Sequence, residues 1–316
     1  MREINKICIV TGSHRSGTTW IGNTIAKGTN SAYIWEPFNL KVPYSKRSSY
    51  GKSFLKIENW YHLVENSDDQ ICNDLAHLFN KRQLDIKGIL SILPKSLKKN
   101  PKATLKWLIN DSKLSINLKI NNSAIIKDPI MLFSTEYISK KLKSKCILIT
   151  KDPRSFYNSL KKASWGFDFK NIYYPCTRFQ HLNEYIYEVE ERLHKGALLD
   201  PKSIGLLWNI LHKHMYYLSK FNNFKLIKYE DICEDPVLHL DKLAVFATTK
   251  KLSKKIKSRI HYEQNNKVSD SQKIQMIRYE NSKKISRLWQ SQLSNNELIE
   301  LEKKCDKILN IFNYDF

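Results

Sequence analysis

The sequence has no long apolar run. None of its hydrophobic stretches approaches the roughly 20 residues that a helix needs to cross a bilayer. The first residues lead straight into a predicted strand and leave no room for a charged and apolar signal segment. We therefore expect no stable membrane insertion and a cytoplasmic location.

Cysteines are few and dispersed. The six cysteines form no CxxC pair, and no group of cysteines and histidines has the spacing of a zinc site. Buried free thiols are the state that such a pattern indicates. The sequence therefore predicts neither a disulfide framework nor a metal centre.

Acidic residues are strongly outnumbered. The chain has 31 Asp and Glu against 53 Lys and Arg, which gives a formal net charge of +22. Such a charge is typical of nucleic-acid partners, but the lysines are spread along the whole chain and lack the interleaved aromatic residues of single-strand binders. We therefore expect no nucleic-acid partner, although a basic surface would attract a polyanionic cofactor or an acidic acceptor.

The most informative segment follows the first predicted strand. An apolar run over 7–10 predicts that strand, and apolar residues at helical spacing after the loop predict a helix. Gly12 and Gly17 have the spacing of a Walker A loop, in which backbone N–H groups at a helix N-terminus bind phosphate. Thr18 stands where that motif requires lysine, and the basic residue lies inside the loop as Arg15. The segment predicts an anion site and argues against hydrolysis of a nucleoside triphosphate.

The segment Gly12–Trp20 resembles the 5′-phosphosulfate loop of sulfotransferases that use 3′-phosphoadenosine 5′-phosphosulfate (PAPS). That family has a basic residue, Ser, Gly, Thr, Thr and usually Trp, in this order, at the same strand-to-helix junction. The resemblance implies that Arg15 stabilises charge on the bridging oxygen as the S–O bond breaks. The donor-binding residues that it implies here are Arg15, Ser16, Gly17, Thr18, Thr19 and Trp20.

A carboxylate follows the next predicted strand, 31–35. Glu36 precedes a proline, which disfavours helix at that position and ends the strand. The carboxyl ends of parallel strands form the ligand-binding edge of an α/β sheet. Carbohydrate-type sulfotransferases have a glutamate shortly after the phosphosulfate loop, and this resemblance implies that Glu36 is the general base.

Two polar residues follow the strand predicted over 123–126. Lys127 is a candidate to hold the sulfuryl oxygens or the acceptor, as the family often shows a Lys-Asp-Pro at this edge. Asp128 is a rival base, and an equally simple interpretation makes it the cap of a strand-to-turn junction.

A second phosphate site is predicted after the strand 145–150. Lys151 lies at the strand end, Pro153 suits the first turn of a helix, and Ser159 lies two turns into it. This unit resembles the family's 3′-phosphate site, which implies that Lys151 and Ser159 bind that phosphate. Lys151 stands where most members have arginine, and lysine cannot make a bidentate contact.

The last segments extend the resemblance. A Tyr-Glu-Asp segment after the strand predicted over 224–228 implies that Tyr229 lies near the adenine. Ser294 and Glu297 have the spacing of a capping box and predict a final helix. Lys284 and Arg287 are candidates for the basic loop that closes over the 3′-phosphate in the family, although the glycine-rich form of that loop is missing.

The order of the elements predicts the fold. Strands alternate with helices, including helices expected over 177–195 and 203–220, so we expect an α/β fold: a mostly parallel sheet flanked by helices, of the P-loop-containing nucleotide-binding type. We expect one domain over residues 1–316. The family resemblance implies that residues 40–122 form a helical cap that binds the acceptor.

These features predict a PAPS-dependent sulfotransferase. It would transfer the sulfuryl group to a hydroxyl or amine of a small-molecule or saccharide acceptor, with a carbohydrate or glycolipid favoured by the resemblance, and would release PAP (adenosine 3′,5′-bisphosphate) without a metal. Two alternatives stay open, a P-loop kinase or NTPase and a non-catalytic basic nucleic-acid-binding protein. The sequence leaves open the acceptor, the oligomeric state and the choice between Glu36 and Asp128 as base.

Overall fold

The computed structural model describes residues 6–40, 57, 59–65, 71, 73, 75, 123–265 and 282–314. The strands in these ranges are β1 (Lys6–Gly12), β2 (Ala32–Trp35), β3 (Ser123–Lys127), β4 (Lys145–Thr150), β5 (Phe167–Asp168), β6 (Ala197–Leu198) and β7 (Phe224–Lys228). The helices that matter most for the site are α1 (Thr18–Thr29), α6 (Thr135–Leu142), α7 (Pro153–Ala163), α10 (Pro201–Leu218), α12 (Pro236–Thr248), α13 (Lys254–Asn265) and α15 (Asn295–Leu309).

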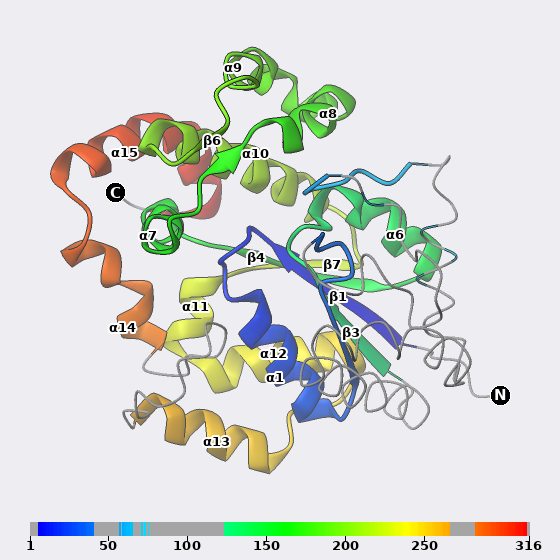
Figure 1. Ribbon diagram of the computed structural model, residues 1–316. Coiled ribbons are helices and arrows are strands. Elements are labelled where there is room, and N and C mark those ends of the chain that lie inside the picture. Colours follow the sequence, from blue (N-terminus) through cyan, green and yellow to red (C-terminus); the bar gives the residue numbers. More distant parts are fainter. Residues whose placement is uncertain are drawn as a thin grey trace, which may run out of the picture.

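Five of these strands form one sheet with the order β2-β3-β1-β4-β7, and every neighbouring pair in it is parallel. Helices α1, α12 and α13 lie on one side of this sheet, and α7, α10 and α15 lie on the other (Figure 1). The predicted α/β fold, a mostly parallel sheet flanked by helices, is therefore confirmed.

The side chains of the central strands alternate between two apolar cores. On β4, Ile147 and Ile149 pack in the core that contains α1 and α12, whereas Cys146 and Leu148 pack in the core that contains α10. All four side chains are fully buried. Because both faces of the strand are covered, β4 reads as a continuous apolar run, as expected for a parallel sheet.

The helices that follow β1 and β4 pack on opposite faces of the sheet. Ile21 of α1 belongs to one core and Phe156 of α7 to the other. Since β1 and β4 are neighbours in the sheet, their carboxyl ends form a topological switch point. In open α/β sheets this is the place where ligands bind.

Helix α10 fixes the backbone at the end of β4. The indole N–H of Trp208 donates to the carbonyl oxygen of Lys151 (2.7 Å), and the N–H of Lys151 donates to Nε2 of His212 (3.2 Å). Nδ1 of the same imidazole lies 2.8 Å from the carbonyl oxygen of Trp208. Burial lowers the pKa of His212 to about 3, so the ring is neutral, with its proton on Nδ1.

One predicted helix was wrong. The segment expected as one helix over 177–195 consists of α8 (Lys170–Arg178), a 3₁₀ helix (Gln180–Tyr185) and α9 (Ile186–Glu190). Phe179 interrupts it with extended backbone angles of φ −104° and ψ 110°. That conformation places the Phe179 ring 4.6 Å from the ring of buried His214, so packing overrides the helical pattern. The short antiparallel pair of β5 and β6 was not predicted.

The predicted cap over 40–122 lies almost wholly outside the described residues. Its described part packs on the domain: the N–H of Val64 donates to Oγ of Ser134 (2.9 Å), and Tyr61 is buried in the core beneath α10. None of the helices in the described ranges is both long and apolar enough to cross a membrane.

The neutral state of His212 predicts how stability depends on pH. The unfolded chain binds a proton near pH 6.5, whereas the folded chain binds it only near the lowered pKa of about 3. Stability is therefore full above pH 6.5 and falls as the pH decreases, by about 1.4 kcal/mol per pH unit for each such histidine. Urea unfolding at pH 7, 6 and 5 measures this slope. The variant His212→Gln should have a shallower slope, and an unchanged slope would contradict a neutral buried ring.

Candidate active site

The loop between β1 and α1 depends on left-handed backbone angles. The φ angles are 150° at Gly12, 67° at Arg15 and 78° at Gly17. A Cβ atom on Gly12 would lie 2.3 Å from the carbonyl oxygen of Ile149, and one on Gly17 would lie 2.5 Å from the ring of Tyr229. Both glycines are therefore required by close packing, and Tyr229 lies directly against the loop.

The polar groups of this loop are incompletely satisfied. Within the described residues no side chain caps α1, whose N-cap is Gly17, so the N–H groups of its first turn could bind a ligand. Thr11 Oγ1 and Ser13 Oγ are buried and have no hydrogen-bond partner in the described part of the chain. Unpaired buried polar groups cost free energy, so the loop retains two polar groups that destabilise it.

The other predicted loop residues differ in their surroundings. Oγ of Ser16 points inward and donates to the carbonyl oxygen of Ser13 (2.5 Å). Thr18 is buried and Thr19 half-buried in the first turn of α1. The ring of Trp20 packs edge-on against Tyr229, with ring centroids 6.4 Å apart. Its indole N–H is also without a partner among the described residues.

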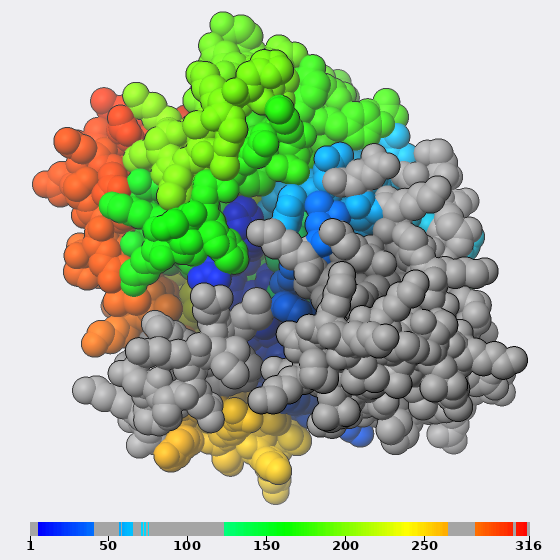
Figure 2. Space-filling view, in the orientation of Figure 1, coloured from blue at the N-terminus to red at the C-terminus, as the bar shows by residue number. Residues whose placement is uncertain are grey.

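The structure brings together the two predicted phosphate sites. Nε of Arg15 donates to Oγ of Ser159 (3.1 Å), and Nζ of Lys151 donates to the carbonyl oxygen of Arg15 (3.0 Å). The exposed Arg15 side chain lies over Trp165, 5.1 Å from the ring centroid. Neither Arg15 nor Lys151 is ion-paired to a described carboxylate. Figure 2 shows the blue N-terminal segment reaching the surface beside the green segment that contains α7.

Lys151 is a buried cation. Its side chain lies over the ring of Tyr229, with Nζ 5.1 Å from the ring centroid. Burial lowers the pKa of Lys151 to about 8, and the positive charge of Arg15 acts in the same direction while Glu230 opposes it. At neutral pH the amine is protonated, and a bound anion would stabilise that charge.

Arg154 does not extend this cationic site. Its guanidinium forms an ion pair with Asp152 (2.5 Å) and lies 4.1 Å from the ring centroid of Trp289. Asp152 also caps α7, since its carboxylate accepts from the N–H groups of Arg154 and Ser155. The guanidinium of Arg154 therefore adds no further cation beside Lys151.

Glu230, in the helix α11 (Tyr229–Glu234) that follows β7, and Tyr314, near the C-terminus, support the end of β4. Glu230 accepts from the N–H of Asp152 (3.1 Å) and from the hydroxyl of Tyr314 (2.9 Å). Burial raises the pKa of Glu230 to about 7. The position of Tyr314 could not have been inferred from a local pattern, because its partner precedes it by 84 residues.

Glu36 and Lys127, the predicted base and its neighbouring lysine, form a buried ion pair across the ends of β2 and β3. The second carboxylate oxygen of Glu36 accepts from Nδ2 of Asn39 (2.5 Å). Burial lowers the pKa of Lys127, and the negative charge of Glu36 opposes that shift. Nζ of Lys127 lies 5.9 Å from the ring centroid of Trp35.

Asp128, the rival base, has no exposed surface. Its two carboxylate oxygens accept from the N–H groups of Phe38 (2.7 Å) and Ile130 (2.9 Å), and its own N–H donates to the carbonyl oxygen of Val10 (3.0 Å). Burial and the charge of Glu36 raise the pKa of Asp128 to about 7.

His14 is a candidate that sequence reasoning missed. Its Nδ1 lies 2.6 Å from the hydroxyl of Tyr61, and its ring packs edge-on against Phe156. Burial, with a smaller effect of Arg15, lowers the pKa of His14 to about 3, so the imidazole is neutral. It joins the phosphate-type loop to the described part of the predicted cap. No spacing in the sequence indicates this contact.

The predicted closing residues lie near the C-terminus. Arg287 forms an ion pair with Glu234 (2.9 Å), and Lys284 belongs to the short helix α14 (Ser282–Ser286). Their role over a phosphate stays a prediction, and residues 266–281 lie outside the described residues. The predicted capping box of Ser294 and Glu297 is confirmed at the start of α15.

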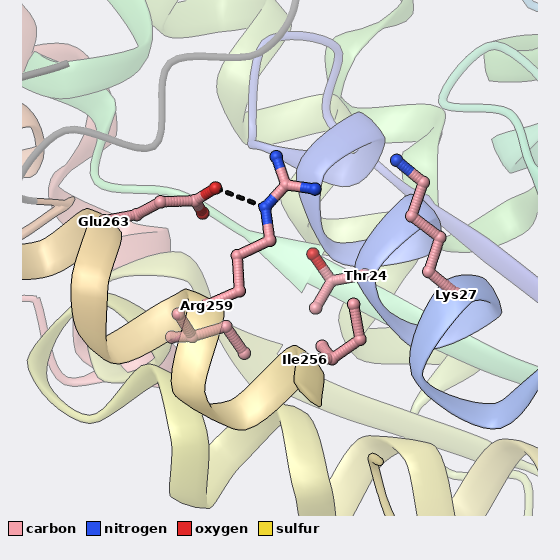
Figure 3. A pocket seen from close by; sticks show the side chains of 6 residues that line it. Thr24, Lys27, Ile256, Arg259 and Glu263 are labelled. Atoms are coloured by element: carbon pink, nitrogen blue, oxygen red, sulfur yellow. Dashed lines mark hydrogen bonds and ion pairs between the residues drawn. The ribbon is translucent and has the colours of Figure 1, made fainter. Parts of the chain in front are cut away.

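A small pocket lies elsewhere, between α1 and α13 (Figure 3). Arg259 and Glu263 of α13 form an ion pair there (2.5 Å). Thr24 and Lys27, from the second half of α1, line the opposite side. None of the predicted site residues lines this pocket.

No protein-family model matches the chain, and no curated protein matches it. In structure it is similar to the sulfotransferase domain of a Synechococcus olefin synthase (13% identity, 100% of this chain and 97% of that chain covered, TM-score 0.48). It is also similar to the sulfotransferase domain from the curacin biosynthetic pathway (15% identity, 100% of this chain and 100% of that chain covered, TM-score 0.48). A third similar structure is retinol dehydratase in complex with retinol and PAP (16% identity, 100% of this chain and 84% of that chain covered, TM-score 0.42). Because these identities and TM-scores are low, we infer the function from the side chains of the site.

Proposed function

We propose that the chain is a sulfotransferase that moves a sulfuryl group from PAPS to a hydroxyl, or an amine, of a carbohydrate or glycolipid acceptor. The observation that carries this proposal is the meeting of Arg15 and Lys151, two cations without a carboxylate partner in the described chain, at the switch point between β1 and β4. The 5′-phosphosulfate and the 3′-phosphate lie at different positions of the ribose, so cations from two neighbouring loops would suit them.

The residues around the loop suit an adenosine phosphosulfate. The N-terminus of α1, which no side chain of the described residues caps, offers backbone N–H groups to anionic oxygens. Lys151 and Ser159 would hold the ribose 3′-phosphate. Tyr229 would lie near the adenine, because its ring packs against Gly17 of the loop and lies under the side chain of Lys151.

The chemistry asks the protein mainly for position and charge. PAPS supplies a sulfuryl group on a good leaving group, a phosphate of PAP. Arg15 would stabilise the negative charge that grows on the bridging oxygen as the S–O bond to the phosphate breaks. Glu36 would take the proton of the acceptor hydroxyl as its oxygen forms the new S–O bond, and Lys127, paired with Glu36, would hold this carboxylate in place.

The alternatives fit these residues less well. A kinase or NTPase of the Walker type needs a lysine where Thr18 lies buried at the start of α1. A nucleic-acid-binding protein would need a basic surface that tracks a strand, and it would leave the buried Lys127–Glu36 ion pair without a role.

Thermal shift with three ligands separates these functions. PAP should stabilise the protein, because its phosphates would pair with Lys151 and with the N–H groups of the loop after β1. At a PAP concentration 100 times the dissociation constant, the gain in the free energy of unfolding is about 2.7 kcal/mol. ATP with Mg²⁺ and a mixed-sequence oligonucleotide should each give a smaller shift. Stabilisation by ATP and not by PAP would overturn the proposal.

Substitution of the predicted base tests the chemical step. Glu36→Gln should lower transfer from radiolabelled PAPS to a panel of methyl glycosides by about 100-fold or more and leave PAP binding intact. Because Gln leaves Lys127 buried without a negative partner, the double variant Glu36→Gln/Lys127→Gln is the control for stability. Loss of PAP binding in both variants would make Glu36 structural.

The lowered pKa of Lys151 predicts how donor binding depends on pH. Only the protonated amine attracts a phosphate, so PAP affinity should fall as the pH rises through the pKa of about 8. Calorimetric titration at pH 7, 8 and 9 measures this loss. The variant Lys151→Arg, whose guanidinium stays charged at pH 9, should retain its affinity across the range. Equal pH profiles for both proteins would exclude Lys151 as the titrating contact.

A further inference from the structure

The tripeptide Lys-Asp-Pro occurs twice at the ligand edge of the sheet, after β3 at 127–129 and after β4 at 151–153, on either side of β1. In both copies the lysine and the aspartate are buried. In both, the aspartate accepts from the N–H two residues later, at 2.9 Å in the first copy and 2.8 Å in the second. The local turn is therefore the same.

The two copies differ in the second bond of the aspartate. Asp152 accepts from the N–H of Ser155 in its own helix. Asp128 accepts instead from the N–H of Phe38, which precedes it by 90 residues and lies in the turn after β2 (2.7 Å). The first copy is thus used to hold another segment of the chain, and that segment carries Glu36.

The turn at Glu36 needs such support. Glu36 has φ 46°, a left-handed conformation that is uncommon and costly for a residue with a side chain. Its N–H donates to the carbonyl oxygen of Lys127 (2.7 Å), and its own carbonyl oxygen accepts from the N–H of Asn39 (3.1 Å). Phe38 lies inside this turn, so the hydrogen bond from its N–H to the carboxylate of Asp128 also holds the turn in place.

Asp128 is itself anchored to the sheet. Its N–H donates to the carbonyl oxygen of Val10 on β1 (3.0 Å). A rigid connection therefore runs from β1 through Asp128 to the turn that carries Glu36. It also sets the geometry of the ion pair, since Lys127 and Asp128 are consecutive residues.

We propose that Asp128 is a positioning residue, which holds Glu36 in the left-handed turn from which its carboxylate can serve as base, and is not the base itself. This inference rests on the proposed function. Asp128 has no exposed surface and both of its oxygens face backbone N–H groups, whereas Glu36 keeps 8% of its surface exposed. Of the two residues, only Glu36 has exposed surface that an acceptor could approach.

The test is an isosteric substitution. In Asp128→Asn one acceptor oxygen becomes an NH₂ group that faces a backbone N–H, so one of the two bonds is lost. We expect the turnover number to fall about 10- to 100-fold, as misplacement of a reacting group does, with the KM for PAPS and the affinity for PAP unchanged. Turnover is measured as total PAP formed from PAPS in the presence of the methyl glycoside panel, which counts transfer to sugar and to water alike.

A double variant separates positioning from general damage. If Asp128 acts through Glu36, then Glu36→Gln/Asp128→Asn is no slower than Glu36→Gln alone. The matched control is Asp235→Asn, which alters an aspartate that caps the remote helix α12 through the N–H of Leu238 and should leave turnover unchanged. Because the one oxygen of Asn can still accept from the N–H of Phe38, Asp128→Ser is measured beside it: the serine hydroxyl can accept locally but is too short to reach Phe38.

The outcomes are distinct. Wild-type turnover in both Asp128→Asn and Asp128→Ser, an additive loss in the double variant, or a loss that appears in the KM for PAPS would each overturn the positioning role while leaving the sulfotransferase intact. A wild-type protein that binds no PAP would overturn both proposals. A lower turnover number in Asp128→Asn at an unchanged KM for PAPS, with no further loss when this substitution is added to Glu36→Gln, supports Asp128 as the residue that positions Glu36.

Discussion

The hydrogen bond from Nζ of Lys151 to the carbonyl oxygen of Arg15 (3.0 Å) joins the two loops on which the candidate site depends. Arg15 has a left-handed backbone (φ 67°), which costs free energy for a residue with a side chain. The ammonium group at its carbonyl stabilises that conformation. Lys151 is held in turn by Trp208 and His212 of α10. The position of the Arg15 guanidinium therefore depends on a buried helix on the far side of the sheet.

Features set by local pattern were predictable from the sequence. The strands over 145–150 and 224–228 have the predicted ends, because short apolar stretches bounded by polar residues identify strands. The loop after β1 was also predictable, because Gly12 and Gly17 are required by its backbone geometry. The capping box of α15 likewise depends on two residues three positions apart.

Contacts between distant segments were beyond local pattern. The ion pair of Glu36 and Lys127 joins residues 91 positions apart, and it exists because β2 and β3 are neighbours in the sheet. The sequence identified both side chains but not their contact. His14 was missed because its partner, Tyr61, lies in a segment without a periodic pattern. The break at Phe179 was missed because burial against His214 outweighs helical propensity.

The charges of the site are divided by β1. On the β4 side, Arg15 and Lys151 have no carboxylate partner within the described chain, whereas on the β3 side the charge of Lys127 is balanced by Glu36. Potentials of opposite sign attract, so an anionic ligand is favoured next to β4 and a neutral group next to β3. Under the proposed function this asymmetry would separate the two ligands. The nucleotide would bind beside Arg15 and Lys151, and the acceptor hydroxyl would bind beside Glu36, where a carboxylate held by Lys127 would take up its proton.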